Sequence, residues 1–377
     1  MVGAVTWYGC SVYDSSLLLP AADSGVKDSS SATDAGTDAH DASKEAAPNP
    51  CPDFGPPAAP SADDPSNDGG QGFVVAVHTI DFGFDAGTLS TIGYDLDDIY
   101  TCCDGGAESC KAAQAGATHC DDVSGRDNSG GQLLASLFII DPSQFTTATV
   151  SQRLQDGVYS ILLQVSDYNG TPNDTQVTAA LYGSDGVESD AGALWNGTDQ
   201  WTVDESFVVN PNGMPLVPTD FDTAAYVADG TLVMHLSFPI SLGTTSTDTF
   251  TINLTGGVIT GQVVSAGNGT FALTGGNISG RWNVSQLLNS LQTVTIGANP
   301  ICPTGPGAST YSFVKQEVCK YADIMTAQSM DNSGATCDAL SLGIGFTADP
   351  ALLGTVQAAA VKTSLCDSDA GPDDCTH

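Results

Sequence analysis

The chain has 377 residues, and its nine Lys and Arg against 44 Asp and Glu give a formal net charge of −35. Because nucleic-acid binding needs a basic surface, this balance all but excludes DNA and RNA as partners. It also disfavours docking on anionic lipid through charge. The length is sufficient for one large domain or two modest ones.

The chain opens on the short stretch MVGAVTWYG, which is followed by Cys10. Nine residues are too few for a secretory signal. A small residue before a cysteine, after a weakly apolar run, nevertheless resembles the end of a bacterial lipoprotein signal. We therefore interpret residues 1–9 as the remnant of a signal peptide and Cys10 as an acylated N-terminus that anchors the protein to a membrane. The alternatives are that Cys10 pairs with Cys51 or stays free.

Residues 20–72 are rich in Asp, Ala, Ser, Pro and Gly and contain almost nothing to bury. Without apolar burial, nothing offsets the entropy lost on folding. We therefore predict that residues 10–72 form a lipid-anchored, disordered, acidic stalk with a reach of about 40 Å. A cleaved pro-segment is the alternative, although no basic cleavage site is visible.

Residues 73–377 are predicted to form a β-rich body. A strand-like run at 73–84 comes first, and a segment rich in cysteine and aspartate follows at 92–131. Helical spacing appears near Leu133, with Asn128 or Ser129 as a cap, and again at 147–154.

From residue 157 the apolar period changes to two. Strands are predicted at 158–165, 177–182, 231–238, 249–255, 258–264, 269–273 and 276–282, with Gly256-Gly257 and Gly275-Gly276 as turns. The segment 283–366 is mixed, with helices at 284–291 and 309–326 and a strand at 340–346. A polar tail covers 367–377. The pattern predicts a mainly β, antiparallel sandwich or barrel-like body with a few short helices, stabilised by disulfides.

Eleven cysteines are present, which in an acidic, Gly- and Thr-rich chain indicates an oxidising compartment. If Cys10 is set aside, ten disulfide candidates remain: Cys51, Cys102, Cys103, Cys110, Cys120, Cys302, Cys319, Cys337, Cys366 and Cys375. Sequence proximity allows the pairs Cys319–Cys337 and Cys366–Cys375, but the sequence leaves the disulfide pairing open.

Aspartates recur within the 92–131 segment, and Asp95, Asp97, Asp121 and Asp127 are candidate ligands for calcium. Calcium takes six to eight oxygen ligands, and a loop fixed by disulfides is able to bring them together. The EF-hand pattern is not present, and the simpler interpretation is that these are solvated turn residues and helix caps. No other cofactor is indicated.

Two tryptophans in the stretch LWNGTDQWTVD, Trp195 and Trp201, are candidates for a platform on which a sugar ring stacks. Such a pair more commonly fills the edge of a core. The surroundings of His78 and Ser129 echo those of a trypsin-like protease. However, only 51 residues separate them and Asn128 replaces the usual Asp, so we assign no catalytic residue.

The cysteine followed by SVYDSSLL, the Asp/Ala/Gly stalk, the block GYDLDxxxTC…C…CDD…GxDN and the closing CDALSLGIGF resemble uncharacterised surface lipoproteins of myxobacteria. The resemblance covers most of the chain and implies no activity. The chain departs from the usual pattern in having GRDN for GVDN and Tyr100 where a cysteine is frequent.

Together, these features predict an exported protein of the bacterial cell envelope, held at the outer membrane or cell surface by a lipid, or secreted. The expected function is that of a non-enzymatic binding or envelope-interaction module for a glycan or a protein ligand. The alternative is a secreted hydrolase whose site is assembled from residues distant in sequence.

Overall fold

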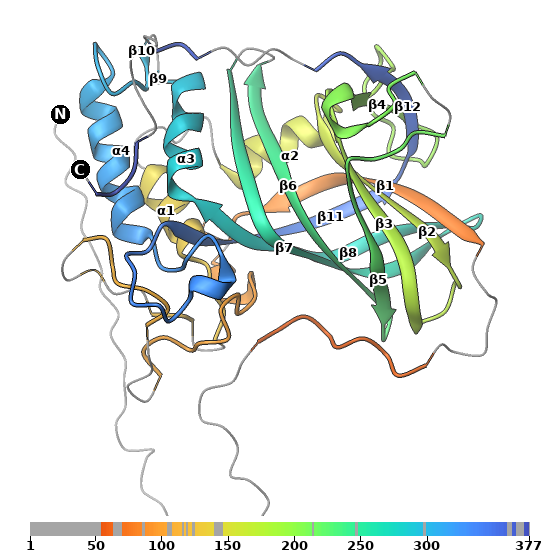
Figure 1. Ribbon diagram of the computed structural model, residues 1–377. Coiled ribbons are helices and arrows are strands. Elements are labelled where there is room, and N and C mark those ends of the chain that lie inside the picture. The colour runs from red at the N-terminus through yellow and green to blue at the C-terminus, as the bar shows by residue number, and fades with distance from the viewer. Residues whose placement is uncertain are drawn as a thin grey trace, which may run out of the picture. The chain divides into compact units, whose positions relative to one another are not determined.

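The computed structural model is mainly β, as the sequence predicts (Figure 1). It describes residues 54–62, 70–84, 87–103, 108–114, 117, 120–122, 125–138, 146–212, 215–245, 248–296, 299–359, 364–366 and 373–376. All of them belong to one unit, Pro48–His377. The predicted membrane anchor Cys10 and the candidate Cys51 lie outside the described residues.

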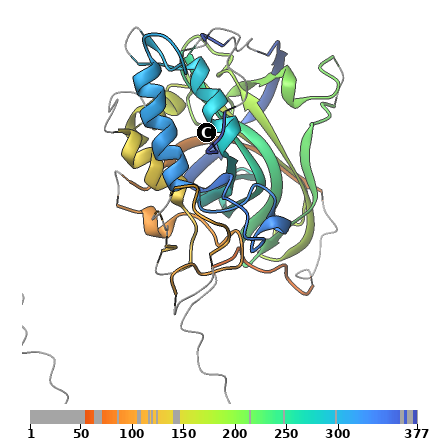
Figure 2. The same ribbon diagram turned by 60° about the vertical axis from the view of Figure 1, so that its left-hand side comes forward.

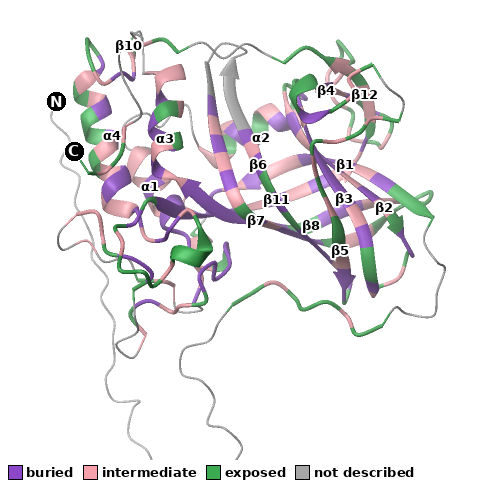
Figure 3. Ribbon diagram, in the orientation of Figure 1, coloured by how far each residue is buried: buried purple, intermediate pink, exposed green. Residues whose placement is uncertain are grey.

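Eight antiparallel strands close into a barrel, which decides between the two predicted β architectures. Their order around the barrel is β1-β11-β8-β7-β6-β5-β3-β2. The strands are β1 (Gln71–Asp81), β2 (Ser160–Tyr168), β3 (Asp174–Ser184), β5 (Asp220–Ala228), β6 (Thr231–Thr245), β7 (Asp248–Gly267), β8 (Thr270–Asn283) and β11 (Ala339–Pro350). An eight-stranded barrel is just wide enough for side chains to fill. Accordingly, buried residues line these strands (Figure 3).

Two long strands replace four predicted ones, because the Gly-Gly pairs are bulges and not turns. The register of β7 against β8 shifts between Thr255 and Val258, at Gly256-Gly257. Gly256 and Gly275 both have φ of +56°, which glycine adopts without strain. The actual turn between β7 and β8 contains Asn268 and Gly269, both at positive φ, which is the Asn-Gly signal of a tight hairpin.

Within the described residues, four α-helices accompany the barrel, and all four were predicted. They are α1 (Ser129–Phe138), α2 (Thr147–Gln155), α3 (Val284–Ser290) and α4 (Ala308–Tyr321). The Asn128 side chain caps α1, accepting a hydrogen bond from the Gly131 amide at 3.1 Å. Helix α4 ends at Tyr321, earlier than predicted, because the chain turns to form a β-bridge between Ile324 and Ala339.

The helices lie on the barrel in two places. Helix α2 packs against β1, whereas α1, α3 and α4 pack together beside β7, β8 and β11, as Figure 2 shows from the turned view. Two small sheets complete the strands: β4 (Gln200–Asp204) with β12 (Leu352–Gln357), and β9 (Thr295–Ile296) with β10 (Asn299–Pro300).

Neither of the two cysteine pairs that sequence proximity allows is formed. The bonds are Cys102–Cys120, Cys110–Cys337, Cys302–Cys366 and Cys319–Cys375, and Cys103 is also disulfide-bonded. Helix α4 brings Cys319 beside the C-terminal segment and not beside Cys337, which faces the loops after β1. Three of these bonds span 56 residues or more, so tertiary structure and not local spacing selects the partners.

The body also begins earlier than the composition indicates. Phe54 stacks on Tyr94 with ring centroids 5.9 Å apart, and the Tyr226 hydroxyl donates to the carbonyl oxygen of Pro57 at 2.5 Å. The segment Phe54–Pro60, predicted as part of the stalk, therefore lies against the barrel.

Candidate metal centre

A set of loops covers the outer face of β8 and β11. We call it the cap: the described parts of residues 92–128, together with residues 322–338. Ile278 on β8 lines a small cavity together with residues from β1, β2, β6 and β11, so it faces the barrel interior. Because side chains alternate along a strand, Ser279 and Arg281 face outward, toward the cap.

Arg281 holds the two halves of the cap together. Its guanidinium donates to the carbonyl oxygens of Leu96 and Met325 and to both carboxylate oxygens of Asp331, at 3.1 and 2.7 Å. Arg281 and Asp331 are both nearly inaccessible to solvent. Beside this ion pair lies a small apolar cluster, which consists of Tyr94, Leu96, Ile324 and Ala339.

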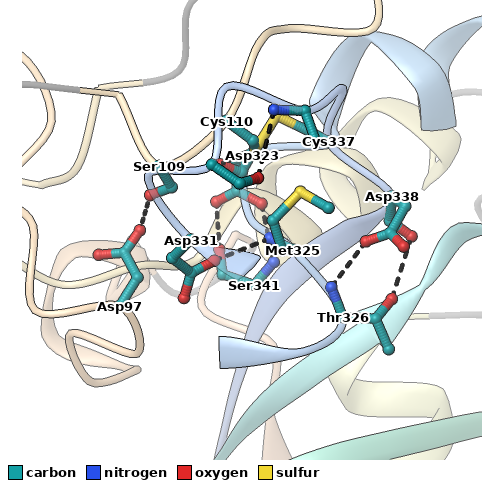
Figure 4. The surroundings of a disulfide bond; sticks show 12 residues. Asp97, Ser109, Cys110, Asp323, Met325, Thr326, Asp331, Cys337, Asp338 and Ser341 are labelled. Atoms are coloured by element: carbon teal, nitrogen blue, oxygen red, sulfur yellow. Dashed lines mark hydrogen bonds between the residues drawn. A yellow bond between two sulfur atoms is a disulfide. The ribbon is translucent and has the colours of Figure 1, made fainter. Parts of the chain in front are cut away.

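Two disulfides fix the cap covalently. Cys102–Cys120 closes the loop within residues 92–128, and Cys110–Cys337 joins that loop to residues 322–338. Figure 4 shows Asp97, Ser109 and Asp323 beside the Cys110–Cys337 bond. The cap is therefore cross-linked at the point where its acidic side chains meet.

Three of the predicted calcium ligands converge. Asp95, Asp97 and Asp127 each offer a carboxylate oxygen, and these oxygens all lie within 4.8 Å of one another. The three residues are buried, with 8, 7 and 2% of their surface exposed. The interpretation as solvated turn residues is thus wrong for these three positions.

Backbone amides fix the orientation of the cluster. Asp95 Oδ1 accepts from the amide of Asp98 at 2.7 Å, and Asp97 Oδ1 accepts from that of Ile99 at 2.8 Å. Asp127 Oδ2 accepts from the amide of Leu96, also at 2.7 Å. Such turns explain why the spacing DLDD places successive carboxylates on one side of the chain.

The fourth predicted ligand, Asp121, joins the edge of the cluster. Its Oδ2 accepts from the Thr101 amide at 2.6 Å, and its carboxyl shares a hydrogen bond with Asp127. Asp323, which the sequence did not single out, adds a fifth negative charge that acts on Asp97, Asp121 and Asp127. Asp323 is held in place by the amide and hydroxyl of Ser341, at 2.8 and 2.6 Å.

Burial, followed by repulsion between the carboxylates, makes the cluster resist ionisation. Burial raises the pKa of Asp97 to about 8 and that of Asp121 to about 7, and the charges of Asp95 and Asp323 raise both pKa values further. The hydrogen bond with Asp127 acts in the opposite direction on the pKa of Asp121. The pKa of Asp127 is also raised well above its ordinary value, first by burial and then by the charges of Asp97 and Asp121. A cation in the cluster would remove this penalty.

The donor set fits a hard divalent cation. Calcium binds oxygen at about 2.3–2.6 Å, so two oxygens on one ion are separated by at most about 5 Å. The separations within the cluster satisfy that limit. All the candidate ligands are oxygens, which calcium prefers, whereas zinc sites favour nitrogen and sulfur.

The two candidate sugar-binding tryptophans do not form an exposed platform. Trp201 is completely buried in the core. Trp195 stacks on His78 with ring centroids 4.1 Å apart, and its Nε1 donates to the carbonyl oxygen of Gln155 at 2.8 Å. The two rings contact each other at 5.1 Å, and Trp195 is partly buried against the core, so the pair fills the edge of the core.

The residues that echo a serine protease have separate partners. His78 Nδ1 lies 2.5 Å from a carboxylate oxygen of Asp349, whereas the Ser129 hydroxyl accepts from that of Ser341 at 3.3 Å. The structure does not pair His78 with Ser129.

Sequence reasoning missed Asp323, Ser109 and the Arg281–Asp331 pair. Ser109 donates to Asp97. Arg281, Asp323 and Asp331 lie 184–236 positions beyond Asp95 and Asp97. No local pattern marks them. Only the closure of the barrel, which places β8 beside β11, brings them to the cap.

A scan against models of known protein families, a search of curated proteins and a search of solved structures found no match to this chain. Among the described residues, none of the helices is long and apolar enough to cross a membrane. The disulfides are characteristic of an oxidising, extracytoplasmic environment.

Proposed function

We propose that this protein is an exported surface protein that carries a binding or envelope-interaction body and whose cap is stabilised by calcium. The observation that supports it most directly is the convergence of Asp95, Asp97 and Asp127 in a buried, disulfide-fixed position. Burial of three carboxylates in one place is costly, so we interpret the cap as a cation site.

The burial of the cluster favours a structural role for the ion. A closed site that is lined by protein carboxylates stabilises a loop, whereas a catalytic site keeps a position open to substrate. Calcium is abundant outside the cytosol at concentrations that suit weak extracellular sites, on the order of 10⁻⁴–10⁻³ M in dissociation constant. The ion and the disulfides thus belong to the same compartment.

The decisive experiment measures calcium binding to the full chain, by titration calorimetry and by thermal unfolding in calcium and in chelator. Calcium is expected to raise the Tm of the native protein, because it binds the folded state alone. An identical Tm in calcium and in chelator, with no heat of binding, would refute the site.

Asp127→Asn is expected to abolish most of the calcium-dependent rise in Tm, because it removes the most buried ligand charge. Asp98→Asn is the matched control, since Asp98 lies in the same loop but is exposed and sits at φ +61°, which Asn tolerates. If both variants keep the calcium response, the cluster is not the binding site.

The lipid anchor is a separate part of the proposal. It rests on the sequence around Cys10 and on the resemblance to surface lipoproteins of myxobacteria. Cys10→Ser is expected to move the protein from the membrane fraction to the soluble fraction, and unchanged fractionation would contradict acylation.

For the ligand, we propose a glycan or a protein of the envelope. A glycan array probed with the full chain in calcium is the direct test of the carbohydrate form. If no polysaccharide on the array binds, the carbohydrate form is refuted and a protein partner remains as the proposal. Cross-linking on intact cells then tests for that partner.

A further inference from the structure

A groove lies between helix α4, the C-terminal segment and one edge of the cap. Its volume is about 480 Å³, which is within the range of clefts that bind small molecules, about 300–1,000 Å³. Figure 1 shows the dark-blue C-terminal segment beside α4. The described lining of the groove does not include the aspartates of the metal centre, so the two are separate features of the body.

The walls of the groove are tied to each other. The Cys319–Cys375 disulfide joins α4 to the C-terminal segment, with a Cα–Cα distance of 5.4 Å. On the other side, the amide nitrogen of the Gln114 side chain donates to the Gln316 carbonyl oxygen at 2.8 Å and holds the edge of the cap against the helix. Because the walls are already fixed, little freedom is lost when a ligand binds between them.

An ion pair lies in the groove. The Lys315 ammonium group donates to Asp373 Oδ1 at 2.6 Å, and the Tyr311 hydroxyl donates to Asp373 Oδ2 at 2.7 Å. The side chains of Lys315 and Asp373 are 20 and 23% exposed, so a ligand in the groove is able to reach both. They are the only charged residues of the described lining, which therefore carries no net charge.

The rest of the described lining combines hydrogen-bonding and apolar groups. Ser312 and Gln316 are exposed on α4, and Gln114 is half-buried. Pro303 and the Cys319–Cys375 bond form the apolar part of the wall. A side-chain amide has both a donor and an acceptor group, and so has a hydroxyl. Such a lining is complementary to a ligand that carries many hydroxyl groups together with small apolar faces.

Other classes of small ligand fit this lining less well. An anion gains little, because Asp373 already neutralises Lys315 and the chain has a formal charge of −35. A cation meets the ammonium group of Lys315 in the same place. An apolar ligand would remove water from the amide and carboxylate groups without replacing its hydrogen bonds, which is costly. A neutral saccharide avoids these penalties, because its hydroxyls donate and accept and its ring faces are apolar.

We propose that this groove is the carbohydrate site of the protein and that it takes a neutral oligosaccharide. The inference rests on the proposed function as a glycan-binding module, to which it adds the place and the chemical class of the ligand. It replaces the tryptophan platform that the sequence predicts, since Trp201 is buried and Trp195 stacks on His78.

The first test measures binding of neutral trisaccharides to the full chain by calorimetry and saturation-transfer NMR. Maltotriose, cellotriose and triacetylchitotriose are used, together with any neutral glycan that the array identifies, and trigalacturonic acid is the charged control. At least one neutral glycan is expected to bind, and the acid is expected to bind at least tenfold more weakly.

The outcomes of this test separate the inference from the proposed function. If only acidic glycans bind, the assigned ligand class is wrong, whereas the proposed function as a glycan-binding module stands. If no glycan binds in either experiment, the inference and the carbohydrate form of the proposed function fail together.

Ser312→Trp tests the position of the site, because the indole ring fills the groove. The neutral glycan is expected to bind this variant at least tenfold more weakly. Phe313→Trp is the matched control: Phe313 lies next to Ser312 on α4, is 45% exposed and is not part of the groove lining, so native affinity is expected. Thermal unfolding checks that both variants fold. Native affinity of the Ser312→Trp variant would show that the sugar binds elsewhere.

Gln316→Ala tests recognition by hydrogen bonds. The bond from Gln114 uses the backbone oxygen of residue 316, so the variant keeps that contact and loses only the side-chain amide. The affinity for the neutral glycan is expected to fall about five- to tenfold, the size of one hydrogen bond. Unchanged affinity would contradict the contact between this amide and the sugar on which the assignment depends.

Discussion

At the residue scale, the cap is built on buried charge. Arg281 neutralises Asp331 and satisfies two carbonyl oxygens, so this ion pair is complete within the protein. Asp97 and Asp127, by contrast, accept hydrogen bonds from the backbone amides of Ile99 and Leu96 and from the Ser109 hydroxyl, and these donors carry no positive charge. The difference explains why burial raises the pKa values of the cluster.

The raised pKa values predict how stability depends on pH. Without metal, the folded state holds protons on Asp97 up to about pH 8 and on Asp121 up to about pH 7, whereas an unfolded Asp releases its proton near pH 4. The folded state thus binds more protons than the unfolded state between these limits. Stability in chelator is therefore present at low pH and is lost as pH rises toward 8.

Calcium is expected to reverse this trend, because it replaces the protons. The calcium-induced rise in Tm should be larger at pH 8 than at pH 5. Calorimetry at pH 7 in two buffers of different ionisation enthalpy should also detect proton release. A calcium effect on Tm that is the same at pH 5 and pH 8 would contradict this linkage.

At the element scale, glycine decides where the long strands bend. Gly257 lies opposite Leu236 in the β6–β7 ladder, where a Cβ atom would come within 2.5 Å of the Leu236 carbonyl oxygen. Gly256, its neighbour, is needed for its positive φ and has open space around it. The same dipeptide therefore meets two different physical demands.

Gly257→Ala is expected to destabilise the barrel by about 3 kcal/mol, because the clash is with backbone that cannot rotate away. Gly256→Ala, the matched control, should cost about 1–2 kcal/mol through its left-handed conformation alone. Chemical denaturation measures both. An equal or smaller loss for Gly257→Ala would show that the strand relaxes around the added methyl group.

At the scale of the whole molecule, disulfides at opposite ends of the fold have different roles. Cys110–Cys337 passes through the cap and closes the largest loop, with a separation of 227 residues. Cys302–Cys366 ties the segment that follows β9 and β10 to the C-terminal part of the chain. Of these two bonds, only Cys110–Cys337 lies beside the aspartates of the cap.

Replacing Cys110 and Cys337 together by Ser is expected to lower both stability and calcium affinity. The chain-entropy account gives a loss on the order of 5 kcal/mol for so long a loop. The matched control replaces Cys302 and Cys366, which should lower stability but leave calcium affinity unchanged. Titration calorimetry measures the calcium affinity of each variant. Equal calcium affinity in both variants would show that the Cys110–Cys337 bond does not support the metal centre.

Local sequence patterns were sufficient to predict the β content, the helices and the kinds of residue that form the cap. Apolar periods of two and 3.6 record which faces are buried, and caps such as Asn128 act within one turn of the chain. The aspartates of the DLDD stretch were also identifiable, because turn geometry acts over a few residues.

Local patterns could not predict which cysteines pair, that the barrel closes, or that Asp323 and Arg281 reach the cap. Each of these depends on contacts between segments far apart in the chain, and no local pattern encodes such distances. The same holds for the segment Phe54–Pro60, which composition assigned to the stalk, and for Trp201, which was a candidate for sugar binding. Packing against Tyr94 and Tyr226, and burial in the core, determined their actual places.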